Sequence, residues 1–151
     1  MFSLFRFGSS TDAAPAEKFE IEKSDEEWRR VLTSAQYDVL RKHGTERPWS
    51  SPLLKEHRKG TFACAGCDLP LFSSDTKFDS GTGWPSFWQP LDNALGRTED
   101  RTYGMARIEV HCRRCGGHMG HVFDDGPKPT GLRYCIDGFG LVFKPSDASA
   151  S

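Results

Sequence analysis

The sequence predicts a mainly β protein in which a short helical arm precedes a body of antiparallel sheets. From Gly60 onward, short apolar runs are separated by glycine and proline, which is typical of short strands joined by tight turns. Before Gly60, the chain carries two motifs that begin helices. The expected strands cover residues 60–63, 70–72, 77–78, 105–110, 121–123, 132–136 and 140–143.

The length of 151 residues suits one domain with its own core. Residues 1–20 include a small, polar, proline-containing run, and residues 146–151 have the same character, so both ends are expected to be mobile tails. A single domain is expected over residues 21–145, with the helical arm at about 24–44 and the β body at about 60–144.

Composition excludes several classes of protein. The net charge of −1 gives no electrostatic footprint for nucleic acid, and the apolar share of 36% argues against a disordered chain. The first residues lack the basic start and apolar run of a secretory signal, and no membrane span is expected. The sequence has no long amphipathic segment of the kind that would indicate an obligate oligomer. We therefore expect a cytoplasmic monomer that binds neither nucleic acid nor membrane.

Two capping boxes predict the helical arm. Ser24 and Glu27 can satisfy free backbone groups of a first turn, and Thr33 and Gln36 repeat the pattern. The second helix is expected to be stopped by Gly44. Four apolar side chains are spaced so that they could pin the arm to the core: Trp28, Leu32, Tyr37 and Leu40.

Four of the five cysteines form two Cys-x-x-Cys pairs, Cys64 with Cys67 and Cys112 with Cys115. Two such turns complete the tetrahedral four-thiolate shell that structural zinc prefers. The pairs lie far apart in the sequence, so the fold must bring them together. A thioredoxin-like dithiol is the competing interpretation, but that motif occurs once, in a strand–helix setting. His111 could compete as a ligand, although a place in solvent or behind the ligands is expected. We expect one structural Zn²⁺ per chain.

Cys135 is the one cysteine without a pairing motif. Apolar and polar residues alternate over residues 132–136, which predicts a strand with Arg133, Cys135 and Asp137 on one face. A neighbouring guanidinium stabilises a thiolate and lowers the pKa of the thiol. Cys135 is therefore the candidate nucleophile, and the competing interpretation is a small buried side chain on a core strand.

Two further stretches carry candidate site residues. His118 and His121 lie between glycines, and histidine is the side chain best suited to exchange protons near neutral pH. The competing interpretation is a hydrogen-bonded turn histidine or a metal ligand. Trp84 and Phe87 lie in a glycine-bounded stretch where aromatic faces could hold a ligand, and core packing is equally compatible with that pattern.

Four motifs in this order establish a family resemblance: CAGCDLPLF, SGTGWPSFW, CRRCGGHMGHVFDDGP and GLRYCIDGFGLVF. With GTERPWSSPLL of the arm, they make the chain similar to the methionine-R-sulfoxide reductases of the B type over residues 24–143. The resemblance implies two antiparallel sheets with short N-terminal helices, and a structural zinc on the four paired cysteines. It also implies a peptide-methionine (R)-S-oxide reductase, an oxidoreductase that acts on oxidised proteins or peptides.

The resemblance assigns roles to individual residues. Cys135 matches the nucleophile, which attacks the sulfoxide sulfur and becomes a sulfenic acid. His121 matches the acid, supported by His118, and Trp84 matches the tryptophan that contacts the methyl group of the substrate. The polar surroundings are completed by Arg133 and Asp125, which match family positions in the same motifs.

Two positions depart from the family pattern. Thr82 occupies the place of a resolving cysteine in many members, so the sulfenic acid of Cys135 would have to be reduced by an external thiol such as thioredoxin, glutaredoxin or glutathione. Asp137 stands where the family usually has asparagine. An ionised Asp137 would oppose the thiolate; alternatively it pairs with Arg133, or stays protonated and donates a hydrogen bond as the amide would.

Two other functions remain open on the same fold. A zinc-knit protein-binding module would keep the four cysteines and bind a partner through its surface. A thiol redox sensor would use the oxidation of Cys135 as a signal. The set of Trp84, His118, His121, Arg133 and Cys135 favours the enzyme, because a binding module needs neither a nucleophile nor a proton donor.

Overall fold

The computed structural model describes residues 18–101 and 104–146. Residues 1–17 and 147–151, which make up most of the two expected tails, lie outside the described part of the chain. Within the described residues, no helix is both long enough and apolar enough to cross a membrane.

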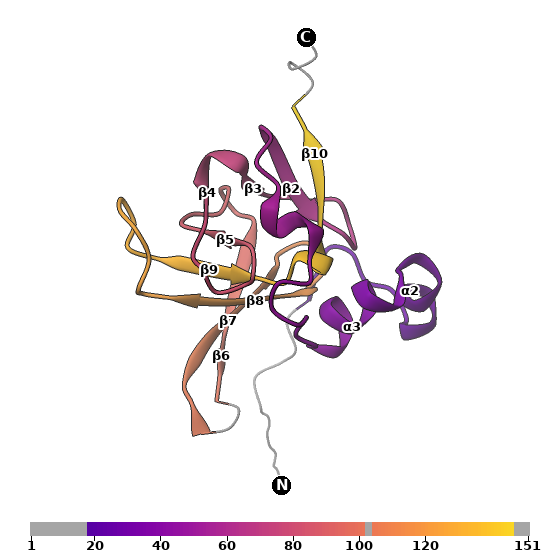
Figure 1. Cartoon of the computed structure of the whole chain (residues 1–151). Coiled ribbons are helices and arrows are strands. Elements are labelled where there is room, and N and C mark those ends of the chain that lie inside the picture. The colour runs from indigo at the N-terminus through magenta and orange to yellow at the C-terminus, as the bar shows by residue number, and fades with distance from the viewer. Residues whose placement is uncertain (1–17, 102–103, 147–151) are drawn as a thin grey trace, which may run out of the picture.

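The described chain is mainly β, as predicted, with two antiparallel sheets (Figure 1). The smaller sheet has the order β10-β2-β3 and the larger one the order β4-β5-β9-β8-β7-β6. The strands are β2 (Gly60–Cys64), β3 (Pro70–Ser73), β4 (Lys77–Phe78), β5 (Ser86–Phe87), β6 (Leu95–Asp100), β7 (Arg107–Cys112), β8 (His118–Phe123), β9 (Arg133–Ile136) and β10 (Leu141–Pro145).

The sequence pattern missed two of these strands. β5 has only two residues and lies in the glycine-bounded stretch of Trp84 and Phe87, where no strand was expected. β6 is an edge strand whose residues are partly or fully exposed, so it shows no alternation of apolar and polar side chains. Both strands matter for the site, because β5 pairs with β9 and β6 pairs with β7.

Aromatic side chains join the two sheets. Phe72 of β3 stacks on Phe87 of β5 with ring centroids 4.1 Å apart, and Phe62 of β2 meets Phe87 edge-on at 5.1 Å. All three are fully buried. Each large aromatic ring removed from water contributes about 1.5–3 kcal/mol of transfer free energy, so this contact holds the smaller sheet on the larger one.

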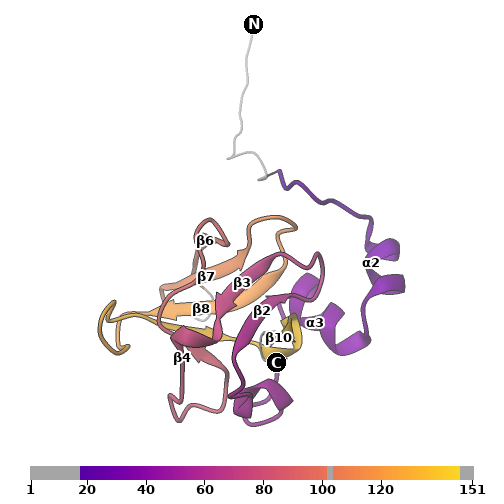
Figure 2. The same cartoon turned by 90° about the horizontal axis from the view of Figure 1, so that it is seen from above.

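The helical arm forms as predicted. Capping boxes begin both α2 (Asp25–Val31) and α3 (Ser34–Lys42), and the two helices lie together on one side of the sheets (Figure 2). α3 contacts β8 and the short helix η5 (Gly138–Gly140), which follows β9. The two other short helices are η2 (Pro52–Lys55) and η3 (Ser74–Thr76). The four expected anchors are all buried: Trp28, Leu32, Tyr37 and Leu40.

The end of α3 differs from the prediction in one respect. The left-handed residue that stops the helix is His43, with φ 56°, and not Gly44. Gly44, the next residue, donates its backbone N–H to the carbonyl of Asp38 at 2.8 Å. The left-handed conformation, although uncommon for a residue with a side chain, directs the His43 ring toward His118 of β8, with ring centroids 4.8 Å apart.

Candidate active site and four-cysteine cluster

The fold brings the two Cys-x-x-Cys pairs together, as predicted. Cys64 Sγ lies 3.7 Å from Cys115 Sγ, and Cys67 Sγ lies 3.5 Å from Cys112 Sγ. Zinc–sulfur bonds of about 2.3 Å in a tetrahedron place the sulfurs about 3.8 Å apart. The four sulfurs are therefore spaced as a tetrahedral metal site requires, and they could hold a metal ion.

The two cysteine pairs are held by similar turns at the ends of β2 and β7. The carbonyl of Cys64 accepts from the Asp68 N–H at 2.8 Å, and the carbonyl of Cys112 accepts from the Gly116 N–H at 2.8 Å. Asp68 and Gly116 both have positive φ, which closes each turn tightly enough to aim two sulfurs at one point. His111 is not part of the cluster; it is buried beside Glu109 and does not face solvent.

Cys135 lies on β9, which is a central strand of the larger sheet. It pairs with Ser86 of β5 on one side and with His121 of β8 on the other. The predicted alternation is confirmed, because Tyr134 and Ile136 are buried at 4% and 0% exposure while Cys135 is only partly buried. The thiol is thus held on a rigid element with its side chain away from the core.

A cavity of about 300 Å³ opens over Cys135. Its wall includes six residues that the sequence analysis had singled out: Thr82, Trp84, His121, Arg133, Cys135 and Asp137. His118 lines a neighbouring cavity of about 490 Å³, which shares Thr45, Arg107 and His121 with the first. Asp125 and Phe87 line neither cavity.

Arg133 is engaged by Asp125 and not by Asp137. Its Nε and Nη2 atoms donate to the two carboxylate oxygens of Asp125 at 2.8 and 3.1 Å, and the guanidinium lies over the Phe123 ring at 4.5 Å. A two-bond fork of this kind fixes the orientation of the guanidinium. Asp125 therefore positions Arg133 at the wall of the cavity, and the pairing of Arg133 with Asp137 that the sequence left open does not occur.

The expected low pKa of Cys135 is not found. Burial raises the pKa of the thiol to about 11; Arg133 opposes this shift, and the nearby carboxyl groups of Asp137 and Glu46 reinforce it. The free thiol is consequently protonated at neutral pH. The sequence shows the positive charge of Arg133 on the same strand. It does not show how deeply the thiol is buried, or that the carboxyl group of Glu46 lies nearby.

Asp137 is buried at the end of β9, with 4% of its surface exposed. One oxygen accepts the backbone N–H of Glu46 at 3.0 Å, and the other lies 3.9 Å from Nε2 of His118. Burial raises the pKa of Asp137 to about 7. The carboxyl group therefore changes its charge near neutral pH, directly beside the candidate nucleophile.

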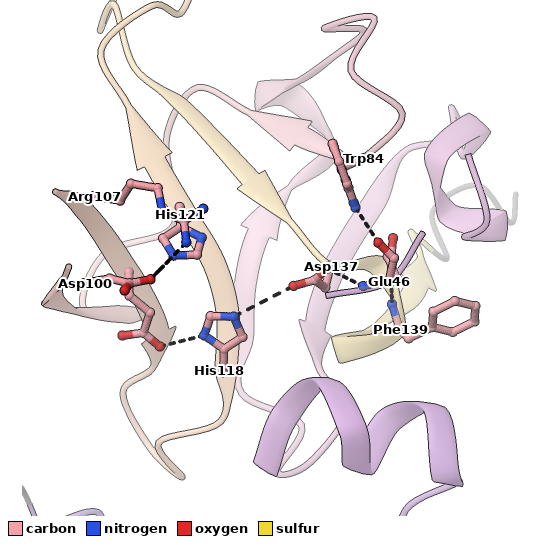
Figure 3. Close-up of polar contacts among 9 residues, drawn as sticks. Glu46, Trp84, Asp100, Arg107, His118, His121, Asp137 and Phe139 are labelled. Carbon is pink, nitrogen blue, oxygen red and sulfur yellow. Dashed lines mark hydrogen bonds and ion pairs between the residues drawn. The ribbon is translucent and has the colours of Figure 1, made fainter. Parts of the chain in front are cut away.

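His118 lies between two carboxyl groups, as Figure 3 shows. Its Nδ1 is 2.8 Å from Oε2 of Glu109, and its Nε2 faces Asp137. Although burial raises the pKa of Glu109, hydrogen bonds from His111 and His118 bring it down to about 2. Because an ionised carboxylate only accepts, Nδ1 of His118 must carry the proton of this bond, which leaves Nε2 facing Asp137.

His121 is held by a carboxylate from β6. Its Nε2 lies 2.8 Å from Oδ2 of Asp100 on β6, and Arg107 donates to the same oxygen at 3.2 Å. Burial lowers the pKa of His121, and the hydrogen bond to Asp100 opposes this shift. Asp100 was missed by sequence reasoning because the exposed edge strand that carries it has no recognisable pattern. Arg107 lies on β7, which was predicted, but nothing in the sequence marked it as a site residue.

Glu46 is a further residue that the sequence did not single out. Its backbone carbonyl accepts from Nε1 of Trp84 at 3.0 Å, and its carboxylate accepts the backbone N–H of Phe139 at 2.9 Å (Figure 3). Together with its N–H bond to Asp137, Glu46 ties the arm to both sides of the cavity. The only available signal was its place in the GTERPWSSPLL segment, which by itself does not distinguish a structural residue from a surface one.

Phe87 has a packing role in place of the expected substrate contact. Its ring is fully buried between Phe62 and Phe72, on the core face of β5. Neighbouring residues on a strand point to opposite faces, so Ser86 points away from the core rings while Phe87 packs among them. The aromatic ring that reaches the cavity from this stretch is that of Trp84.

Comparison with known proteins identifies the family of the chain. The family model described as "SelR domain" matches residues 32–145. The peptide methionine sulfoxide reductase MsrB of Agrobacterium fabrum is 55% identical over 127 residues, which are 83% of this chain and 94% of that protein. The MsrB proteins of Leptospira interrogans (53%; 83% of this chain, 97% of that protein) and Methanosarcina barkeri (57%; 84% and 90%) are similarly close. The chain therefore belongs to the SelR domain family, as an oxidoreductase of the MsrB peptide methionine sulfoxide reductase type.

Proposed function

We propose that the protein reduces methionine-R-sulfoxide in proteins or peptides to methionine, with Cys135 as the nucleophile. The observation that carries this proposal is the cavity that gathers Cys135 with Trp84, His121, Arg133 and Asp137. It places a thiol, an indole and groups that can exchange protons around one space, as attack on a sulfoxide requires. The cavity opens to solvent, so that an exposed side chain of another protein could enter it.

The reaction takes place in two balanced steps. In the first step, the sulfur of Cys135 attacks the sulfoxide sulfur to form an S–S bond, and the protonated sulfoxide oxygen leaves as water. Water then attacks the Cys135 sulfur, which breaks the S–S bond, releases methionine and leaves a Cys135 sulfenic acid. Two external thiols then reduce the sulfenic acid, which returns the Cys135 thiol and releases one disulfide and one water. Sulfoxide is thus reduced by two electrons that finally come from the thiols.

The surrounding residues support the first step in distinct ways. Because the Cys135 thiol is protonated in the free protein, its proton must move as the sulfoxide binds, and the proton can serve the departing oxygen. We assign this transfer to His121, supported by His118, whose ring centroid lies 5.7 Å from that of His121. Arg133, fixed by Asp125, supplies positive charge beside the developing thiolate and oxyanion. The indole of Trp84, held by Glu46, forms an apolar wall for the methyl group.

The reductant is proposed to be an external thiol, from thioredoxin, glutaredoxin or glutathione. The chain has five cysteines, and the four others form the cluster. The hydroxyl of Thr82, and not a second thiol, lies with Cys135 at the cavity wall. No internal partner is therefore available to form a disulfide without dismantling the cluster.

We further propose that the four-cysteine cluster holds one Zn²⁺ in a structural role. Sulfur spacings of 3.5 and 3.7 Å suit a zinc–thiolate tetrahedron. A bound zinc would offset half of the charge of the four thiolates and would join β2 to β7. Four protein ligands leave it no open position for chemistry.

Reduction of the separated R and S epimers of a peptide methionine sulfoxide, with dithiothreitol as reductant, tests the function. We expect turnover of the R epimer and none of the S epimer, because a rigid cavity accepts one arrangement of methyl, oxygen and lone pair about the sulfur. Product methionine is measured by chromatography. Folded, zinc-loaded protein that turns over neither epimer would shift the assignment to a binding module or a thiol sensor.

Asp137→Asn is expected to lower the pKa of Cys135 and to raise reductase activity at neutral pH and above. Asp137 becomes negative only as the pH rises past about 7, and its charge then disfavours the thiolate. Below that pH the residue is neutral, so wild type and variant should behave alike. The rate of Cys135 alkylation by iodoacetamide, measured from pH 6 to 10, reports the shift.

The control for this titration is Asp92→Asn, which removes the same charge from an exposed aspartate. Alkylation of the control should follow the wild-type curve. An Asp137→Asn curve that coincides with the wild type above pH 8 would contradict the electrostatic role of Asp137.

A further inference from the structure

Two histidines and one glutamate form a second cluster of metal-ligand side chains, outside the four cysteines. His43, Glu109 and His118 each offer one ligand atom, and these atoms lie within 4.8 Å of one another. We propose that this triad is a second metal site, which binds a divalent transition-metal ion such as Zn²⁺ and inhibits the reductase when occupied.

The donor set decides which ions suit the site. Two imidazole nitrogens and one carboxylate oxygen are a combination that Zn²⁺ and other first-row transition metals accept. Mg²⁺ and Ca²⁺ prefer shells made of oxygen, which this cluster cannot supply. The proposed ligand is therefore a borderline-soft dication and not an alkaline-earth ion.

Three elements of the fold converge on the cluster. Glu109 lies on β7 and His118 on the adjacent strand β8, and their side chains already meet at 2.8 Å. His43 reaches them from the end of α3 because its left-handed backbone turns the chain there. Its ring is 4.8 Å from that of His118, centroid to centroid. Two ligands are thus fixed and buried, while the third is exposed and can rotate by the small amount that closes the site.

The cavity of about 490 Å³ provides access and room for the remaining coordination positions. All three proposed ligands line it. Its charged wall residues also favour a cation, since three carboxylates outnumber two guanidinium groups: Glu99, Asp100 and Glu109 against Arg101 and Arg107. A dication in this cavity can complete its shell with water.

Inhibition follows from the position of His118, and this part of the inference rests on the proposed function. A metal at Nδ1 of His118 would replace its hydrogen bond to Glu109, whereas a metal at Nε2 would separate the ring from Asp137. In either case the nitrogen of His118 that holds the metal can no longer take up or release a proton. The added positive charge would also oppose protonation of His121, which lines both cavities.

Calorimetric titration with zinc sulfate tests the site directly. The starting protein is the full chain already carrying one zinc per molecule. We expect one further equivalent to bind to the wild type. Removing a residue that only hydrogen-bonds a metal ligand already lowers metal affinity by about 10–100-fold. His43→Ala removes a ligand itself, so it should weaken binding of the second equivalent by about tenfold or more. His57→Ala is the matched control, because His57 is an exposed histidine that lines neither cavity.

Activity is measured alongside, without and with added zinc. His43 is outside the proposed catalytic set, so His43→Ala should match the wild type without added zinc and should need about tenfold more zinc for half-inhibition. Absence of a second equivalent, or equal affinity in His43→Ala and His57→Ala, would overturn the metal site. Binding without inhibition would overturn its regulatory part. A protein with no activity before zinc is added contradicts the proposed function alone, because the calorimetric result still decides the metal site.

Discussion

Replacement of Cys135 by serine is expected to abolish turnover of methionine-R-sulfoxide, with a loss of about 10⁴-fold or more. The hydroxyl of serine is a far weaker nucleophile toward sulfur, and it cannot hold the oxygen as a sulfenic acid. Serine is close to cysteine in size, and the side chain is only partly buried, so the sheet should be unchanged. The measurement is the rate of R-epimer reduction at saturating dithiothreitol.

A single-turnover experiment makes the same prediction more specific. One equivalent of sulfoxide, added to wild-type protein without reductant, should yield one equivalent of methionine and a Cys135 sulfenic acid that dimedone traps for peptide mass mapping. The serine variant should give neither product. A disulfide between Cys135 and a cysteine of the cluster would contradict the cycle, because it would make an internal thiol the reductant.

Cys115→Ser is expected to unfold the protein or to lower its thermal midpoint by tens of degrees. Structural zinc in small peptides contributes apparent binding free energies of about 10–16 kcal/mol, which equals or exceeds the total stability of about 5–15 kcal/mol that is typical of a domain. The metal here would join the ends of β2 and β7, which belong to different sheets. Circular dichroism melting and zinc analysis of the same sample give the result.

Cys135→Ser is the matched control for this variant. It makes the same chemical change at the one cysteine outside the cluster, so it should keep one zinc per chain and the wild-type melting curve. A Cys115→Ser protein that melts like the control and lacks zinc would show that the cluster does not hold the sheets together.

Local signals in the sequence were sufficient for much of the fold. The capping boxes at Ser24 and Thr33 depend on contacts within four residues, and both form as predicted. Alternation on β9 could be recognised because one face of the strand is buried. β6 could not be recognised, since an exposed edge strand buries neither face and its position depends on pairing with β7.

The sequence predicted part of the site's residues but not its electrostatics. Strand periodicity placed Arg133 and Cys135 on one face, and the cavity contains both. The orientation of the Arg133 guanidinium relative to the thiol depends on Asp125, eight residues earlier, which holds it through two hydrogen bonds. The pKa of Cys135 depended on burial and on Glu46 of the arm, and neither can be read from neighbouring residues in the sequence.

The place of Cys135 on a central strand has a consequence for kinetics. β9 is hydrogen-bonded to β5 and β8, so the oxidised cysteine cannot swing out of the sheet to meet a thiol elsewhere. The reducing thiol must come to the same cavity that the sulfoxide has just left. The proposed cycle therefore has a ping-pong order, in which double-reciprocal plots at several reductant concentrations are parallel. Each substrate, in large excess, should inhibit by occupying the form of the enzyme that awaits the other.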